Sequence, residues 1–378
     1  MMILGALKEQ SSREKRIPLL PASVKKMIDQ GMTVCVEEGL GESLFINDQA
    51  FRDSGAQIKS RSEILASADI LVRISKPSID DIKTLKSGTV HLSYLDPFND
   101  PETLKQMASH GLSAISLEMI PRTTLAQKMD VLSSQASLAG YYAVVLAASR
   151  ISKAFPMMMT PAGTIPPARV FVVGAGVAGL QAIATAKRLG ARVEAFDTRP
   201  AVEEQVRSLG ARFLKIDLGE TGEAQGGYAK QLTEAQLDKQ RQEMAKVCAQ
   251  SDIVITTAQV FGRKAPRIIT KNMIMGMRPG SVIVDMAVET GGNVEGSLVD
   301  QDVELNGVLI LGLSNLPGKV AADASSMFSN NITSLILHYW DKASKSLKFS
   351  QEDEILKGCL LASQGKILNE KFQHLQKA

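Results

Sequence analysis

One short segment limits the possible folds more than any other: a run of β-branched and apolar residues that leads directly into a glycine-rich turn. Arg169–Val173 reads RVFVV and predicts a buried strand, and GAGVAG follows it without a break. The next residues, Leu180–Leu189, are rich in alanine and predict a helix that ends at Gly190. A strand, a glycine turn and a helix in this order are typical of a dinucleotide-binding α/β domain.

Each glycine of this turn has its own physical reason. Gly174 permits the tight turn, Gly176 lets the backbone approach a pyrophosphate, and Gly179 lets the helix pack closely on the strand. The N–H groups at the start of the helix then face the phosphates. The alternative is a glycine-rich turn in an α/β domain that binds no nucleotide.

An acidic residue completes the pattern. A second strand, Arg192–Phe196, ends at Asp197, which lies 23 residues after Gly174. A carboxylate at this place accepts hydrogen bonds from both ribose hydroxyls of NAD and repels a 2′-phosphate, so we predict NAD(H) rather than NADP(H). Arg199 is the counter-argument, because a nearby arginine can hold a 2′-phosphate.

A second polar group lies in the segment EMIPRTTLAQKMDVLSSQ, just before an alanine-rich helical run. Its polar members are Arg122, Gln127, Asp130 and Ser133. An Arg–Asp pair with an intervening amide can fix a nicotinamide carboxamide and its ribose. From spacing alone, however, a capped loop that enters a helix is the favoured interpretation.

Strands and helices alternate along the rest of the chain, which predicts an α/β fold with mainly parallel sheets. Candidate strands cover residues 1–6, 33–36, 70–74, 90–95, 113–116, 212–216, 253–256, 282–285 and 308–311. A long helix near 132–150 is the expected connector between domains. The tail, 323–378, is expected to be rich in helix and to pack back on the first domain.

The composition excludes several classes of function. Among 378 residues 44% are hydrophobic and the net charge is +3, so binding to nucleic acid or to an anionic membrane has no electrostatic support. No run reaches about 20 uninterrupted apolar residues and no signal-peptide pattern opens the chain, so we expect a cytoplasmic protein. The distant cysteines predict reduced thiols, no histidine has metal-ligand spacing, and Met157–Met159 are expected to pack in a core.

Longer blocks of sequence resemble a known family. PRTTLAQKMDVLSSQASLAGY, the segment around the glycine turn, GGYAK, VDMAVETGGN and SNLPGKVAADAS resemble the soluble NAD(H)-binding domain I of the alpha subunits of proton-translocating NAD(P) transhydrogenases. Alanine dehydrogenases are the related alternative. The resemblance implies two Rossmann-like, doubly wound parallel-sheet domains separated by a cleft. One comprises residues 1–130 with 325–378, and the NAD(H)-binding domain comprises residues 131–324.

The resemblance also assigns site residues. It implies that Arg122, Gln127, Asp130 and Ser133 position the nicotinamide and its ribose, so the capped-loop interpretation is no longer favoured. It implies that a mobile loop with Gly227 and Tyr228 closes over the nucleotide. The full set of implied nucleotide contacts is Gly174, Gly176, Val177, Gly179, Asp197, Thr198, Arg199, Gly227, Tyr228, Gln240 and Gln259.

Three positions depart from the family pattern. Arg73 stands where both relatives usually carry Lys, Asp96 where alanine dehydrogenases have a catalytic His, and Gln259 where an apolar residue is expected. An amino-acid dehydrogenase needs an acid or base that titrates near neutral pH, which an arginine and an ordinary aspartate do not supply. Hydride transfer between two nicotinamides needs no proton at either C4, only close approach of the two C4 atoms, to roughly 3–3.5 Å.

The chain shows one clear dinucleotide turn, so the second nucleotide must lie on another protein. The resemblance implies an NADP(H)-binding domain III attached to membrane-spanning subunits, where NADH reduces NADP⁺ coupled to proton translocation. We therefore predict a homodimeric, soluble subunit that is peripheral to the inner membrane through its partner subunits alone. The alternatives are an alanine-dehydrogenase-like amino-acid dehydrogenase and a non-catalytic NAD(H)-binding protein.

Overall fold

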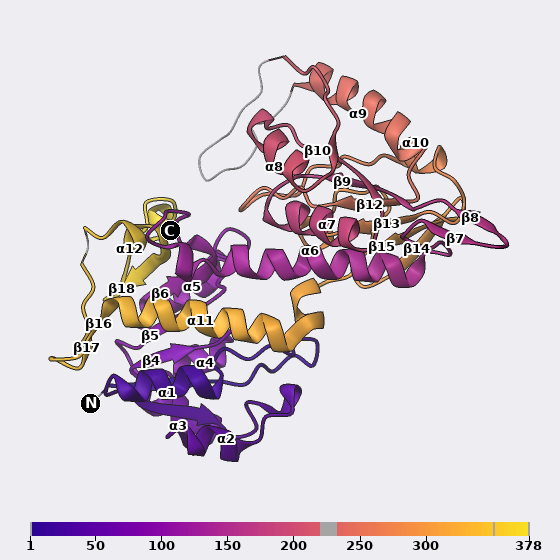
Figure 1. Cartoon of the computed structure of the whole chain (residues 1–378). Helices are drawn as coiled ribbons and strands as arrows, with labels where there is room; N and C mark the ends of the chain where they lie inside the picture. The colour runs from indigo at the N-terminus through magenta and orange to yellow at the C-terminus, as the bar shows by residue number, and fades with distance from the viewer. Residues whose placement is uncertain (1, 220–232, 351, 377–378) are drawn as a thin grey trace. The chain divides into compact units, whose positions relative to one another are not determined.

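The chain folds into two compact units, and Figure 1 shows their elements along the chain. The computed structural model describes residues 2–219, 233–350 and 352–376. Unit 1 comprises Met1–Gln135 and Gly318–Ala378, and unit 2 comprises Ala136–Pro317. Unit 2 is therefore inserted into the sequence of unit 1.

Unit 1 contains an eight-stranded sheet whose six parallel strands lie in the order β3-β2-β1-β4-β5-β6. This order reverses direction at β1, as in doubly wound α/β folds. The parallel strands are β1 (Ile3–Ala6), β2 (Thr33–Glu37), β3 (Gln57–Lys59), β4 (Ile70–Val72), β5 (Val90–Ser93) and β6 (Ser113–Ser116). The helices of the unit are α1 (Pro21–Asp29), α2 (Asp48–Asp53), α3 (Arg61–Ser67), α4 (Ile79–Thr84), α5 (Pro101–Ser109), α11 (Ala321–Tyr339) and α12 (Glu354–Cys359).

The C-terminal tail completes this sheet. Two of its strands, β18 (Leu360–Ser363) and β19 (Lys366–Ile367), add antiparallel to the edge at β6. A short hairpin of β16 (Trp340–Asp341) and β17 (Ser346–Leu347) follows α11. The expectation of a helix-rich tail is therefore wrong beyond α11, because the last segments pair with a free strand edge.

Unit 2 contains a seven-stranded sheet in the order β11-β10-β9-β12-β13-β15-β14, parallel except for β14. Its strands are β9 (Arg169–Val173), β10 (Arg192–Phe196), β11 (Arg212–Phe213), β12 (Ile253–Thr256), β13 (Val282–Asp285), β14 (Asp302–Leu305) and β15 (Val308–Leu311). Its helices are α6 (Val131–Arg150), which begins in unit 1, α7 (Val177–Arg188), α8 (Glu203–Ser208), α9 (Glu234–Cys248) and α10 (Lys271–Met275). The predicted doubly wound α/β class is confirmed in both units.

Both faces of the unit 2 sheet are buried, which explains the continuous apolar strands in the sequence. Along β9, Val170 and Val172 belong to one core cluster, together with residues of α6 and α7. The alternate residues, Phe171 and Val173, belong to a second cluster on the other face, with residues of α9 and α10. Strand residues thus contribute to two cores with a period of two.

Helix α6 needs a separate remark. Among the described residues it is one helix that is long and apolar enough, by length and composition, to cross a membrane. Ala143, Val144 and Ala147 are fully buried in the core of unit 2, however, and Gln135 near its start donates to the carbonyl of Ala324. A core helix satisfies the same two criteria, and we interpret α6 as one.

One exposed hairpin contradicts a prediction. β7 (Met158–Thr160) pairs antiparallel with β8 (Gly163–Ile165), and both strands are exposed. Met157 is 58% exposed and Met159 is 77% exposed, so these methionines do not pack in the core of this chain.

Candidate functional site

The glycine turn is built as the sequence predicts. Gly174 follows β9 with a φ of +96°, which a residue with a side chain rarely adopts. Gly176 is the N-cap of α7, and no side chain caps this helix, so its first N–H groups are available to an anion. A Cβ on Gly179 would lie 1.9 Å from the carbonyl oxygen of Gly174, so only glycine permits this approach of helix to turn.

The turn lies at the topological switch point of the sheet, where nucleotides bind in doubly wound folds. β12 is the strand next to β9 on the side away from β10. Thr257, which follows β12, donates from Oγ1 to the carbonyl oxygen of Gly174 at 3.1 Å. Sequence analysis missed Thr257, because its importance depends on which strand neighbours β9.

Asp197 lies beside this turn and makes four hydrogen bonds within the chain. Its Oδ2 accepts from the backbone N–H of Ala175 at 2.7 Å and from Nη2 of Arg199 at 2.9 Å. Its Oδ1 accepts from the backbone N–H and from Nε of Arg199, both at 2.9 Å. The predicted ribose acceptor is therefore fixed to the glycine turn by one bond and paired with the predicted counter-argument, Arg199.

The predicted nicotinamide loop belongs to unit 1. Asp130 is buried and accepts from the backbone N–H of Ser133 at 2.9 Å and from its hydroxyl at 2.6 Å, which is an N-cap on α6. Arg122 and Gln127 are exposed, the latter in a short 3₁₀ helix, Gln127–Met129. On the far side of this turn, Asn331 of α11 donates to the carbonyl of Lys128. The loop is thus capped and held from α11, while two of its polar side chains remain accessible.

The remaining predicted contacts have different environments. Gln240 lies within α9, is 5% exposed and donates to Sδ of Met244, whereas Gln259 is exposed after β12 and donates to the carbonyl of Met286. Val177 is exposed at the first position of α7, and Thr198 is half-buried. Gly227 and Tyr228 lie outside the described residues. The roles of all these residues stay predictions.

A buried carboxylate organises the next loop along the same sheet edge. Asp285 ends β13, is fully buried and accepts from the backbone N–H groups of Ala287, Asn293 and Val294 at 3.0–3.1 Å. Asn293 in turn bonds both the N–H and the carbonyl of Ala258. These bonds join the loops after β12 and β13, and sequence analysis did not single out either residue.

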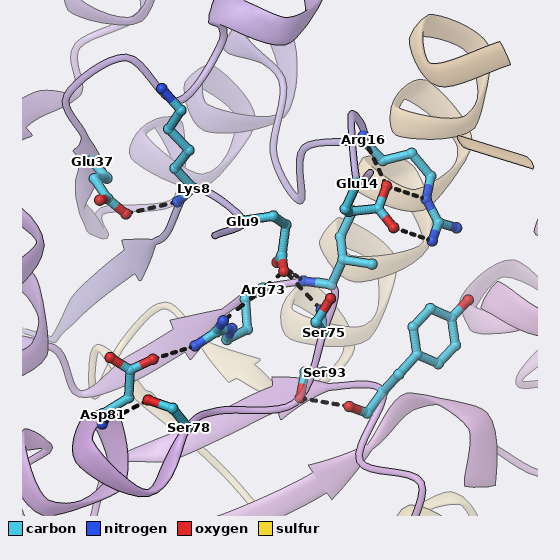
Figure 2. Close-up of polar contacts among 12 residues, drawn as sticks. Lys8, Glu9, Glu14, Arg16, Glu37, Arg73, Ser75, Ser78, Asp81 and Ser93 are labelled. Atoms are coloured by element: carbon cyan, nitrogen blue, oxygen red, sulfur yellow. Dashed lines mark hydrogen bonds and ion pairs between the residues drawn. The ribbon is translucent and has the colours of Figure 1, made fainter. Parts of the chain in front are cut away.

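The corresponding edge of the unit 1 sheet is filled by its own charged side chains (Figure 2). After β1 there is no glycine turn, and Glu9 instead accepts from the backbone N–H groups of Ile74 and Ser75, which follow β4. Arg73 is 3% exposed and pairs with Asp81 at 2.7 Å. A carboxylate of the chain itself therefore occupies the backbone donors that an anion would need at this switch point.

Two sequence departures can now be placed. Arg73 is one of these buried groups, so its charge is spent on Asp81. Asp96 is exposed with a φ of +50°, and Asn99 donates to it. Burial and the neighbouring guanidinium of Arg73 lower the pKa of His91 in β5 to about 3, so this imidazole is neutral near pH 7. None of these three groups offers a proton near neutral pH.

Arg16 forms the third element of this region. It is buried and donates from Nε and Nη2 to the two carboxylate oxygens of Glu14, at 2.9 and 2.7 Å (Figure 2). Its Nη1 donates to Oε1 of Gln135 at 2.8 Å. These bonds tie the segment after β1 to the start of α6.

Two doubly wound sheets, one with a glycine turn and an acidic residue at its switch point, define the dinucleotide-binding class of α/β proteins. Comparison with known proteins agrees, because residues 5–139 match the family described as alanine dehydrogenase/PNT, N-terminal domain, and residues 143–370 match its C-terminal domain. The chain belongs to the alanine dehydrogenase/PNT family. Family and fold together imply that it binds NAD(H).

Individual relatives narrow the comparison. The chain is 42% identical over 376 residues to the first of the chains that make up the NAD(P) transhydrogenase alpha subunit of Rhodospirillum rubrum, covering 97% of this chain and 98% of that protein. The solved structure of a transhydrogenase from Sinorhizobium meliloti matches with a TM-score of 0.85 and 40% identity, covering 98% of this chain and 99% of that one. An alanine dehydrogenase of Methanococcus maripaludis is 25% identical over 378 residues, covering 98% and 95%. The predicted resemblance is confirmed, and alanine dehydrogenase is the more distant relative.

Proposed function

We propose that this protein is the NAD(H)-binding alpha subunit of a proton-translocating, Re/Si-specific NAD(P) transhydrogenase. In this role it binds NADH, and a hydride passes from C4 of its nicotinamide to C4 of NADP⁺ on a partner domain. The transfer moves two electrons and no separate proton, yielding NAD⁺ and NADPH. One observation carries the proposal: of the two sheet edges with a switch point, unit 2 offers a glycine turn with a ribose-side acid and unit 1 fills its own edge with Glu9.

The residues at the glycine turn fit a dinucleotide. A Cβ on Gly176 would meet nothing nearer than Nη2 of Arg199 at 4.0 Å, so space for a phosphate lies directly over the backbone. Val177 begins α7 with its N–H groups toward this space. In the proposal these groups bind the pyrophosphate, Asp197 binds the adenosine ribose, and Thr198 and Arg199 border it.

The nicotinamide end is assigned to the loop of unit 1. Exposed Arg122 and Gln127 are available to the carboxamide and its ribose, and Asp130 with Ser133 fixes the loop at the start of α6. In the proposal these four residues orient the ring and exclude unproductive poses. Gln240, Gln259 and the segment with Gly227 and Tyr228 are proposed as further contacts.

The lack of a suitable acid or base favours this reaction over amino-acid oxidation. Arg73 is buried against Asp81, and Asp96 is an exposed carboxylate, so neither supplies a group that titrates near pH 7. Hydride transfer between nicotinamides requires alignment instead. The partner would supply NADP(H) and the membrane-spanning subunits, and through it the protein would be peripheral to the inner membrane.

We also propose that the protein is a homodimer. The hairpin β7–β8 exposes Met157, Met158 and Met159 with Ile165, and exposed apolar groups of this kind are typical of protein interfaces. Sedimentation velocity of the wild type and of Met159→Glu measures this. A monomeric wild type would contradict the proposal.

The test of the function uses the full chain and a separately produced NADP(H)-binding transhydrogenase domain. NADH-dependent reduction of an NADP⁺ analogue is followed by absorbance, and Gln127→Ala and Asp130→Asn are expected to lose at least tenfold in rate with NADH still bound. Arg192→Ala, an exposed residue at the start of β10, is the control.

Two results would overturn the assignment. Rapid oxidation of L-alanine with NAD⁺ by the chain alone would favour the amino-acid dehydrogenase. Tight NADH binding without turnover in the presence of the partner domain would favour the non-catalytic alternative.

A further inference from the structure

The hydrogen bonds of Asp197 leave no acceptor position unused. An ionised carboxylate offers about four lone-pair sites. In this chain Oδ1 accepts twice, from N and Nε of Arg199, and Oδ2 accepts twice, from N of Ala175 and Nη2 of Arg199. Two of the four donors belong to the backbone, and the other two belong to the Arg199 guanidinium.

This arrangement bears on how a ribose is recognised. The 2′- and 3′-hydroxyls of an adenosine ribose bring two O–H donors to a carboxylate. The backbone donors are fixed by the turn, so the two hydroxyls can only replace Nε and Nη2. Binding NAD(H) is therefore a one-for-one exchange of guanidinium donors for ribose donors.

The Arg199 side chain also lies over the glycine turn itself. Its Nη2 is 4.0 Å from the position of a Cβ on Gly176, and the side chains of Arg199 and Asp197 are 14% and 7% exposed. The guanidinium thus places a positive charge at the junction of the ribose and phosphate positions. A 2′-phosphate entering there meets an ion pair rather than a bare carboxylate.

We propose that Arg199 sets the nucleotide specificity of this site, as an internal competitor for Asp197 and a partial countercharge for a 2′-phosphate. The inference rests on the proposed binding of NAD(H). It predicts that the protein discriminates against NADPH less strongly than an unpaired aspartate would, because the cation offsets like-charge repulsion.

The experiment titrates the full chain with NADH and with NADPH and measures both dissociation constants by nicotinamide fluorescence. Arg199→Ala is expected to raise the ratio of the NADPH to the NADH dissociation constant at least tenfold. Arg199→Lys keeps the charge but not the two-nitrogen contact, and the ratio is expected to stay within about threefold of wild type. Arg207→Ala, an exposed arginine of α8, is the matched control and is expected to leave the ratio unchanged.

A double-mutant cycle shows whether the two residues act as a pair. In an Asp197→Asn background, Arg199→Ala is expected to change the ratio less than threefold, because no carboxylate remains to be offset. An unchanged ratio in Arg199→Ala, with normal NADH binding and an unchanged thermal midpoint, refutes the inference alone. Failure of the wild type to bind NADH refutes the inference and the proposed function together.

Discussion

The close contact at Gly179 yields a sharp prediction for Gly179→Ala. The added Cβ would lie 1.9 Å from the carbonyl oxygen of Gly174 and 2.8 Å from its carbon. A close carbon–oxygen contact needs about 3.3 Å, so the start of α7 must move away from the turn by roughly 1.4 Å. Overpacking of this kind costs about 3 kcal/mol in the free energy of unfolding, and it displaces the N–H groups proposed to bind the pyrophosphate.

Two measurements check this prediction. Thermal unfolding is expected to show a midpoint lowered by about 6–12 °C, and a fluorescence titration is expected to show an NADH dissociation constant raised at least tenfold. Gly276→Ala is the matched control, because Gly276 ends α10 with a φ of −83° and its nearest Cβ contact would be an ordinary 3.5 Å. A Gly179→Ala protein with wild-type stability and NADH affinity would refute the packing argument.

Three further predictions concern buried polar groups. Asp285→Asn is expected to lower the free energy of unfolding in urea by about 2 kcal/mol, since an amide N–H would face a backbone N–H such as that of Val294; an unaltered midpoint would contradict this. Arg73→Met is expected to cost about 3 kcal/mol or more in the same assay, because it leaves Asp81 buried without one of its two cations, and a stabilised variant would contradict this. His91 has a pKa of about 3 in the folded chain and about 6.5 unfolded, so the unfolded state binds more protons in between and stability falls with pH by up to about 1.4 kcal/mol per unit below 6.5; urea titrations at pH 7 and pH 5 should show a smaller loss for His91→Leu, and an equal loss would exclude this histidine as the cause.

The elements that sequence predicted well are those fixed by local pattern. Arg169–Val173, Ile253–Thr256 and Val308–Leu311 are strands with the predicted bounds, because continuous β-branched and aliphatic runs have few other uses. The glycine turn and Asp197 were also found, since their spacing reflects a single βαβ unit.

The features that sequence missed depend on neighbours that are distant in the chain. The role of Thr257 follows from the pairing of β12 with β9, and that of Asp285 from a loop that folds back over it. Likewise Arg199 was weighed as a phosphate ligand, but its bonds to Asp197 need the actual side-chain geometry. The exposed hairpin was missed because methionine is as common in cores as at interfaces.

The pairing of β18 with β6 has a consequence for biosynthesis. Residues 136–317 are contiguous and can fold as soon as they leave the ribosome, whereas the edge of the first sheet waits for residues 360–363, about 240 positions after β6. During that interval β6 presents unpaired backbone groups to other nascent chains. Premature stop products that lack the last 20 residues should therefore retain the nucleotide-binding unit yet aggregate through an uncovered strand.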